Sequence, residues 1–326
     1  MPARTLLPRR RPRAVALALA LAVLLTGCGS TDAPEVPRSA PPRTVTLVAQ
    51  STSEGDVLTA LYAVLLEQAG YRVEVADPAP REEYLAALRA GRAQLAPDYV
   101  SALAETLRGE GTAGTAPGAG RAGAVPAAAP EAALAELEGL ARDAGLAVLA
   151  PARAEDVRSF AVTRAFAARH RLRTLSDLAR SRQPVALAAD TECATRADCA
   201  EGLREVYDVQ LRRIVPVGID GGDTLEQLRD GAVQLAQVSS TDGRLAGRDG
   251  DVVVLADDRD LQPSQQVVPV ADAGWLADQP TVRTVLADLV PVLTTEALRG
   301  LNAEVDSGRA SSREAAETWL GEQGLL

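Results

Sequence analysis

The alternation of short apolar runs with amphipathic stretches between Thr44 and Tyr99 constrains the fold more than any other feature of this sequence. Apolar residues at a period of two predict strands, and apolar residues at i, i+3, i+4 and i+7 predict helices. Strand, helix, strand, helix, strand is the pattern of a parallel α/β sheet. The predicted strands are residues 44–49, 72–75 and 93–95, and the predicted helices follow Ser53, as a helix cap, and Pro80.

The same pattern resumes after an interruption at residues 109–130. There the composition collapses to Gly, Ala, Pro and Thr, which predicts a flexible insertion on the surface. A second α/β unit follows, and three C-terminal helices without a sheet of their own should pack on the first unit. The elements predicted after the insertion are helices at 131–144, 174–179, 203–207 and 224–229, and strands at 146–149, 160–162, 185–188, 214–217, 235–238, 252–255 and 267–271.

A polar turn ends the predicted strand at 235–238. Four short polar side chains, from Ser239 to Asp242, stand at its carboxyl end, where α/β sheets usually bind ligands. Local sequence alone also allows a turn that only caps the next segment. We expect two lobes with two crossings between them. The predicted crossings lie near residue 150 and at 239–244, and the predicted lobes are residues 44–150 with 245–326, and residues 151–244.

Residues 1–27 have the form of a lipoprotein signal peptide. Five arginines precede an apolar run at 14–25, which is shorter than the roughly 20 residues that a membrane-spanning helix needs. The run ends in Leu-Thr-Gly-Cys28, which resembles a bacterial lipobox, in which the cysteine is lipidated and becomes the first residue of the mature chain. We expect Cys28 to anchor the protein at the outer face of the cell membrane, with residues 28–43 as a disordered tether.

Charge and composition exclude several classes of function. The formal net charge is -10, and removal of a signal peptide with five arginines and no acidic residue brings it to -15. Such an acidic domain should not bind nucleic acid and should meet a membrane only through its anchor. His170 is the only histidine, and no catalytic triad, metal-ligand spacing or phosphate loop can be assembled. We therefore predict no enzymatic activity, no cofactor and no metal.

Two cysteines remain after Cys28. Cys193 and Cys199 are separated by five residues, and in an exported protein such a pair predicts a disulfide that closes one loop. A metal site is the weaker alternative, because the chain has one histidine and no CxxC spacing.

Several short segments occur in an order and at a spacing that are specific, although no single segment is decisive. They are residues 61–67, 70–71, 88–91, 96–99, 175–178, 192–199, 202–203, 207, 239–244 and 301–306. Through them, residues 44–326 resemble the substrate-binding proteins of ABC importers for glycine betaine, carnitine, choline and related osmoprotectants.

The resemblance implies a type II periplasmic-binding-protein fold. Each lobe would be an α/β unit with a mainly parallel sheet flanked by helices, and the two lobes would close on a ligand between them. The implied protein is a monomer that captures a small molecule outside the cytoplasm and delivers it to the permease subunits of an ABC importer. The alternative is a ligand-sensing or partner-binding lipoprotein that keeps the fold without transport.

In the family's quaternary-ammonium binders, the cation lies in a cage of aromatic rings, whose faces attract a desolvated cation. Tyr99 matches a cage tyrosine, and Phe160 falls where a tyrosine is common. Ser239, Gln265 and Gln266 stand where aromatic residues are usual. If each ring contributes roughly 1 kcal/mol, the loss of three lowers the affinity by a factor on the order of a hundred.

The replacement side chains donate and accept hydrogen bonds, so we expect a cleft for a small zwitterion or polar cation. Alternatives stay open for three of its members: Phe160 in the core, Arg196 paired with Asp198, and Ser53 as a cap only. The predicted ligand-binding residues are Tyr99, Phe160, Ser239, Gln265 and Gln266, with Arg196 for a carboxylate and Ser53 at a helix N-terminus that suits an anionic group.

Overall fold

The computed structural model describes residues 43–111, 128–217, 223–246 and 250–326. The predicted signal peptide, Cys28 and the tether up to residue 42 lie outside the described residues, as does most of the predicted insertion at 109–130. Within the described ranges, no helix is both long enough and apolar enough to cross a membrane.

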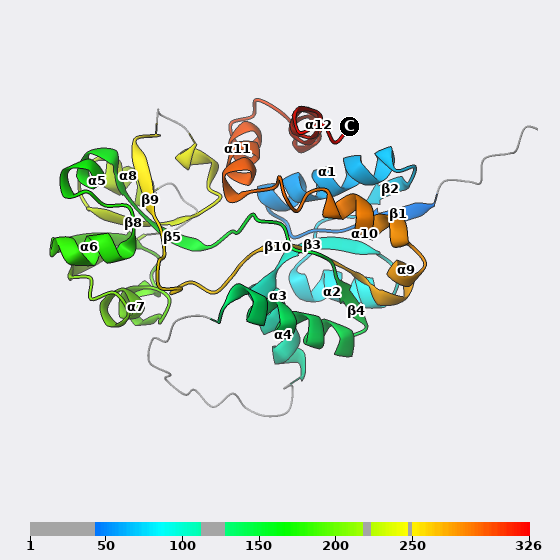
Figure 1. Cartoon of the computed structure of the whole chain (residues 1–326), viewed down its shortest axis with the longest axis horizontal. Helices are drawn as coiled ribbons and strands as arrows, with labels where there is room; N and C mark the ends of the chain where they lie inside the picture. Colours follow the sequence, from blue (N-terminus) through cyan, green and yellow to red (C-terminus); the bar gives the residue numbers. More distant parts are fainter. Residues whose placement is uncertain (1–42, 112–127, 218–222, 247–249) are drawn as a thin grey trace, which may run out of the picture. The chain divides into compact units, whose positions relative to one another are not determined.

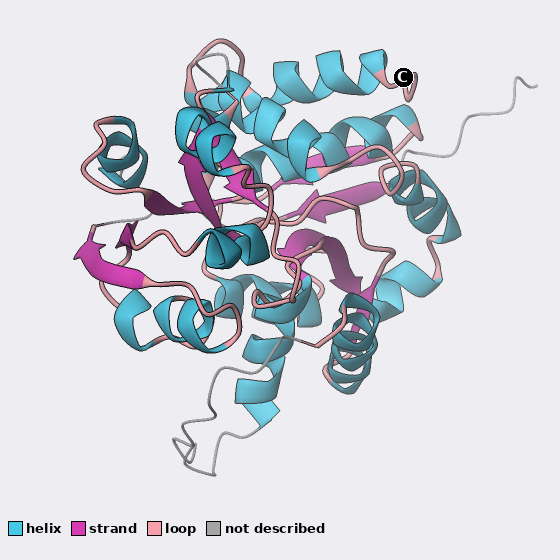
Figure 2. Cartoon of the chain, turned by 60° about the vertical axis from the view of Figure 1, so that its left-hand side comes forward, coloured by secondary structure: helices cyan, strands magenta, loops and turns pink. Residues whose placement is uncertain are grey.

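The first sheet has five strands, and its helices lie on both faces (Figures 1 and 2). Its middle strand pairs in parallel on one side and antiparallel on the other. In spatial order the strands are β2 (Arg72–Val75), β1 (Thr44–Leu47), β3 (Leu95–Tyr99), β10 (Val267–Asp272) and β4 (Leu146–Val148).

One face of this sheet packs on α1 (Ser53–Gln68) and on the C-terminal helices, which confirms where those helices were expected to pack. The other face packs on α2 (Arg81–Arg89), α3 (Val100–Gly111) and α4 (Pro130–Asp143). Alternation along each strand sends neighbouring side chains into these two cores. The C-terminal helices are α9 (Ala273–Ala277), α10 (Pro280–Ala287), α11 (Thr295–Asp306) and α12 (Ser312–Glu322), one more than the sequence predicted.

The cap of α1 is Thr52 rather than Ser53, so that detail of the prediction was wrong. Thr52 has extended backbone angles, φ -135° and ψ 152°, and its hydroxyl accepts a hydrogen bond from the Gly55 N–H at 2.9 Å. Ser53 is the first helical residue, because its backbone already has helical geometry.

The second sheet repeats this arrangement with five further strands. Its helices are α5 (Arg164–His170), α6 (Leu175–Ser181), α7 (Ala200–Glu205) and α8 (Asp223–Arg229). In spatial order its strands are β7 (Leu211–Pro216), β6 (Val185–Ala189), β8 (Leu235–Ser239), β5 (Arg158–Thr163) and β9 (Val252–Leu255).

The two lobes therefore have one topology, and the two-lobe α/β fold is confirmed. The sheets are mixed rather than mainly parallel, because each has two parallel and two antiparallel pairings. In each sheet the strand that arrives from the other lobe, β5 or β10, runs antiparallel to the middle strand, β8 or β3.

The second crossing lies later in the chain than 239–244, which corrects the predicted lobe boundary. β9 pairs with β5, so residues 252–255 belong to the second sheet and not to the first lobe. The chain returns to the first sheet only at Val267. The two crossing segments bond to each other: the Ala152 N–H donates to the Val267 carbonyl at 2.8 Å, and the Val267 N–H donates to the Ala154 carbonyl at 2.9 Å.

Cys193 and Cys199 are joined by a disulfide in the structure. Both cysteines are fully buried in the core of the second lobe. The bond closes the turn that precedes α7 and thereby holds the loop that carries Arg196 and Asp198.

Candidate ligand-binding site

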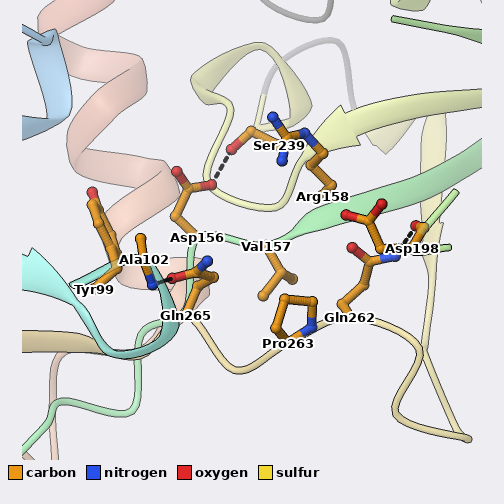
Figure 3. Close-up of a pocket in the computed structure, with 10 residues that line it drawn as sticks. All are labelled: Tyr99, Ala102, Asp156, Val157, Arg158, Asp198, Ser239, Gln262, Pro263 and Gln265. Atoms are coloured by element: carbon orange, nitrogen blue, oxygen red, sulfur yellow. Dashed lines mark hydrogen bonds between the residues drawn. The ribbon is translucent and has the colours of Figure 1, made fainter. Parts of the chain in front are cut away.

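A cavity of about 240 Å³ lies where the ends of the two middle strands meet; we call it the smaller cavity (Figure 3). Tyr99 is the last residue of β3, and Ser239 is the last residue of β8. Because β3 and β8 hold the same position in their sheets, the two residues are topological counterparts. The lining residues are Tyr99, Ala102, Asp156, Val157, Arg158, Asp198, Ser239, Gln262, Pro263 and Gln265.

Asp156 and Gln265 are also counterparts, placed by the two crossings. Each stands two residues before the strand that enters its sheet, which begins at Arg158 in β5 and at Val267 in β10. The Asp156 N–H donates to the Gln265 carbonyl at 3.1 Å, and the Gln265 side-chain oxygen accepts from the Ala102 N–H at 3.2 Å. Each lobe thus supplies one strand end and one crossing segment to the cavity.

The Asp156 carboxylate is held by Ser239, whose hydroxyl donates to it. The Thr241 hydroxyl lies 3.1 Å from the Ser239 hydroxyl oxygen, and the Thr241 N–H donates to the same oxygen at 3.2 Å. This chain of hydrogen bonds fixes the carboxylate at the junction of the two lobes.

Glu54, in the first turn of α1, lies at the same junction. The Tyr99 hydroxyl and the Asn302 amide of α11 both donate to its carboxylate, the latter at 2.6 Å. Burial, and then the negative charge of Asp156, raise the pKa of the Glu54 carboxyl. Burial and the charge of Glu54 raise the pKa of Tyr99 well above its ordinary value, so the phenol stays protonated and remains a donor.

A buried ion pair between Asp98 and Arg81 stabilises the end of β3 at Tyr99. Asp98, which is fully buried, accepts hydrogen bonds from the Arg81 guanidinium at 2.8 and 3.1 Å and from the Tyr84 hydroxyl. The Tyr99 N–H donates to the same carboxylate at 2.8 Å. These contacts hold the end of β3 in one position.

A larger cavity of about 1070 Å³ shares Tyr99, Asp156 and Ser239 with the smaller one. It extends between the start of α1, the turn after β8 and α11. Ser53 lines it, and the Ser53 hydroxyl donates to the Asp306 carboxylate at 2.6 Å. Five carboxylates and three arginines line this cavity among the described residues, so its charge favours a cation.

The structure brings four predicted residues to these cavities and leaves three elsewhere. Tyr99, Ser239 and Gln265 line the smaller cavity, and Ser53 lines the larger one. Gln266 lines neither, and its side-chain amide donates to the Ala152 carbonyl at 3.3 Å.

Phe160 is a core residue, not a cleft wall, which corrects that prediction. It is 1% exposed and packs in the core of the second lobe. Arg158 precedes Phe160 by two positions, so the two side chains lie on the same side of β5. Arg158 is the first residue of β5 and lines the smaller cavity.

Arg196 is bound to carboxylates of its own lobe and lines neither cavity. Its guanidinium pairs with Asp190 at 2.8 Å and with Asp198. Those contacts, above all the one with Asp198, raise the pKa of Arg196 against the opposing effect of burial. A ligand carboxylate would have to displace one of these partners.

The sequence predictions missed Asp156, Arg158 and Glu54 as candidate site residues. Asp156 lies two residues before β5, Arg158 is the first residue of β5, and no local sequence motif marks either of them. The equivalence follows from the shared topology of the two sheets: Gln265 stands two residues before β10, and the equivalent position before β5 is Asp156. Glu54 follows Ser53 at the helix N-terminus that was expected to face the cleft, but only Ser53 was predicted to bind ligand.

The decisive comparison is with models of protein families. Residues 43–322 match the OpuAC model, described as the substrate binding domain of ABC-type glycine betaine transport system. This chain belongs to that family. Membership agrees with the two-lobe α/β fold.

Curated relatives of this OpuAC-family chain are distant in sequence. It is 27% identical over 184 residues to the glycine betaine-binding protein YehZ of Escherichia coli K12, a match that covers 54% of this chain and 60% of the relative. It is 26% identical over 162 residues to the carnitine transport binding protein OpuCC of Listeria monocytogenes, covering 49% and 51%. The chain therefore matches about half to six tenths of the length of these relatives.

Solved structures confirm the OpuAC-family fold. A crystal structure of a glycine betaine/carnitine/choline ABC transporter protein superposes with a TM-score of 0.74 at 22% identity, covering 87% of this chain and 99% of the other. Apo YehZ from Escherichia coli superposes with a TM-score of 0.70 at 22% identity, covering 88% and 100%. At these identities the likeness concerns the fold.

Proposed function

We propose that this chain is an extracytoplasmic solute-binding protein that captures a small zwitterion or polar cation between its lobes and delivers it to the permease of an ABC importer. The observation that carries the proposal is the meeting of Tyr99, Glu54 and Asp156 at one junction. Carboxylates attract a cationic head, and the face of a tyrosine ring adds cation–π attraction.

Arg158 supports a zwitterion rather than a simple cation. It lines the smaller cavity beside Asp156, its side chain is 50% exposed, and its nearest carboxylate, Asp190, is 4.0 Å away (Figure 3). A guanidinium in this state is able to receive a ligand carboxylate. The family model describes a domain of a transport system, and OpuCC is named a carnitine transport binding protein, which supports import over the alternative of a sensing lipoprotein.

Calorimetric titration of the purified full chain with glycine betaine, carnitine, choline and small amino acids tests the proposal. We expect saturable binding by at least one compound, and Tyr99→Ala should weaken it roughly tenfold, because the ring and its hydrogen bond to Glu54 are both lost. The matched control is Tyr71→Ala, which removes a tyrosine whose hydroxyl bonds Gln279 at 3.0 Å and which lines neither cavity. Flat titrations throughout would refute solute binding.

The membrane attachment belongs to the same proposal and rests on the lipobox-like sequence before Cys28. We expect the native protein in the membrane fraction, facing outward. Cys28→Ala should release it from the membrane, because one lipidated residue supplies the attachment. Retention of that variant in the membrane fraction would show that Cys28 is not the anchor.

A further inference from the structure

The lining of the two cavities carries information about the ligand beyond its charge. We infer that the site selects cations with N–H bonds, that is primary or secondary ammonium groups, over fully methylated ammonium compounds. This inference rests on the proposed function and specifies the substrate class of the same site.

Few aromatic surfaces are available to a cation. Tyr99 is the one aromatic residue among the described residues that line the two cavities, and its hydroxyl is engaged by Glu54. A quaternary ammonium cannot donate a hydrogen bond, so its stabilisation depends on several ring faces around it. One ring cannot enclose such a group.

Five carboxylates line the larger cavity, and three of them, Glu54, Asp156 and Asp306, form no ion pair with an arginine in the described part of the chain. Glu54 and Asp156 are the two that lie at the junction of the lobes. Glu54 accepts from Tyr99, Asn302 and the Thr241 side chain, and Asp156 accepts from Ser239. A carboxylate has about four lone-pair sites, so acceptor capacity remains on both groups. The arginines of this cavity pair with other carboxylates: Arg81 with Asp98, Arg244 with Asp242, and Arg309 with Glu304.

Asn302 adds a buried acceptor that is independent of this acidic pair. Its amide nitrogen donates to the Glu54 carboxylate at 2.6 Å and to the Thr241 carbonyl at 3.0 Å, which fixes the orientation of the amide. Its oxygen is buried and has no donor among the described residues, although Asn302 is only 5% exposed and lines the larger cavity. A buried acceptor without a donor is unfavourable. Because this oxygen has almost no solvent-accessible surface, a ligand N–H would satisfy it only after a small movement of the residues around Asn302.

These acceptors distinguish ligands by their number of N–H bonds. An ammonium N–H can bond a carboxylate or the amide oxygen, whereas a methyl group in its place leaves that acceptor desolvated and unpaired. Sites built to bond a ligand N–H discriminate strongly against the analogue that lacks it. Affinity should therefore fall as N–H bonds are replaced by methyl groups.

The test uses a series of zwitterions that differ only in N-methylation: glycine, sarcosine, dimethylglycine and glycine betaine. A second series runs from ethanolamine to choline. Dissociation constants for the full chain are measured by calorimetry. We expect about tenfold weaker binding for each N–H lost, as for one charge-assisted hydrogen bond. Affinity that is equal along both series, or that rises with methylation, would overturn the inference while upholding solute binding.

A carboxylate variant links the selectivity to this junction. Asp156→Asn should reduce the difference between the two ends of each series at least tenfold, and it keeps an acceptor for Ser239, so the fold is expected to persist. Glu304→Gln removes the same charge from the same cavity at a residue already paired with Arg309, and should leave the selectivity unchanged. Equal selectivity in both variants would overturn the role of Asp156. Absence of binding by every compound would refute the proposed function as well.

Discussion

Glu54 is a titratable residue at the junction of the two lobes, and its protonation changes the charge of the larger cavity. It is held between Tyr99 and Asn302, and burial together with the charge of Asp156 raises its pKa. Ionisation of Glu54 is therefore less favourable in the empty cavity than it is in water. A bound cation offsets the repulsion between the two carboxylates, so ligand binding and deprotonation of Glu54 favour each other.

Acidification should weaken the binding of a cationic ligand. As the pH falls towards the raised pKa of Glu54, the carboxyl gains a proton and the cavity loses one negative charge. The ligand-free protein responds in the opposite sense. Because the folded-state pKa exceeds the unfolded one, the stability from this group is fully present below the unfolded pKa and is lost as the pH rises through the folded pKa.

Titration calorimetry between about pH 7.5 and about pH 5 measures this effect, with a slope of at most about tenfold per pH unit for one proton. Glu54→Gln should flatten the dependence. His170, the only histidine, lines neither cavity. A pH dependence that is unchanged in Glu54→Gln would place the titrating group elsewhere.

The turn after β8 contacts helix α11, and residues of both line the larger cavity. The Arg299 guanidinium of α11 donates to the Ser240 carbonyl at 2.7 and 2.9 Å, and Asn302 donates to the Thr241 carbonyl. This turn was predicted as a crossing. Instead, this turn of the second lobe is hydrogen-bonded to helix α11 of the first lobe.

Gly243→Ala should break this contact. A β-carbon at Gly243 would lie 2.6 Å from the Ala303 nitrogen and 2.7 Å from the Ala303 α-carbon, so the turn would have to leave α11. We expect a loss of about 1–3 kcal/mol in the free energy of unfolding, as for overpacking elsewhere, together with weaker ligand binding. Urea denaturation measures the first effect.

The control for this substitution is Gly139→Ala in α4, where an added β-carbon meets nothing within 4 Å. It should stabilise the protein by about 0.5–1 kcal/mol, since alanine is the better helix former. Equal effects of the two substitutions would show that the close approach at Gly243 does not matter.

Each lobe has its own hydrophobic cores, whereas residues of both lobes line the candidate site. Ligand addition should therefore slow amide hydrogen exchange in both lobes together, at the end of β3, along the crossing at 154–158 and at the end of β8. Mass spectrometry of peptic peptides resolves these segments. Protection confined to one lobe would mean that the ligand binds outside the shared junction.

Much of the fold could be predicted because its signals are local. The strands and helices around residues 44–99, the helix at 131–144 and the last sheet strand at 267–271 follow from hydrophobic period, caps and helix stops. Three helices escaped prediction: α3, which directly follows β3 without a turn signal, α5, which is short and rich in arginine, and one of the four C-terminal helices.

The sequence by itself determined most of the elements, the α/β class and the position of Ser239 at a strand end, because these depend on neighbours along the chain. The strand predicted at 93–95 lies at 95–99 in the structure, so Tyr99 ends it rather than following it. Only the tertiary structure decided which side chains share a cavity. Phe160 and Arg158 stand two residues apart on one strand, and sheet depth places the first in the core and the second at the cavity. The pairing of β9 with β5 moved the second crossing, and that crossing sets Asp156 beside Gln265. Such pairings join residues far apart in sequence, which local periodicity cannot specify.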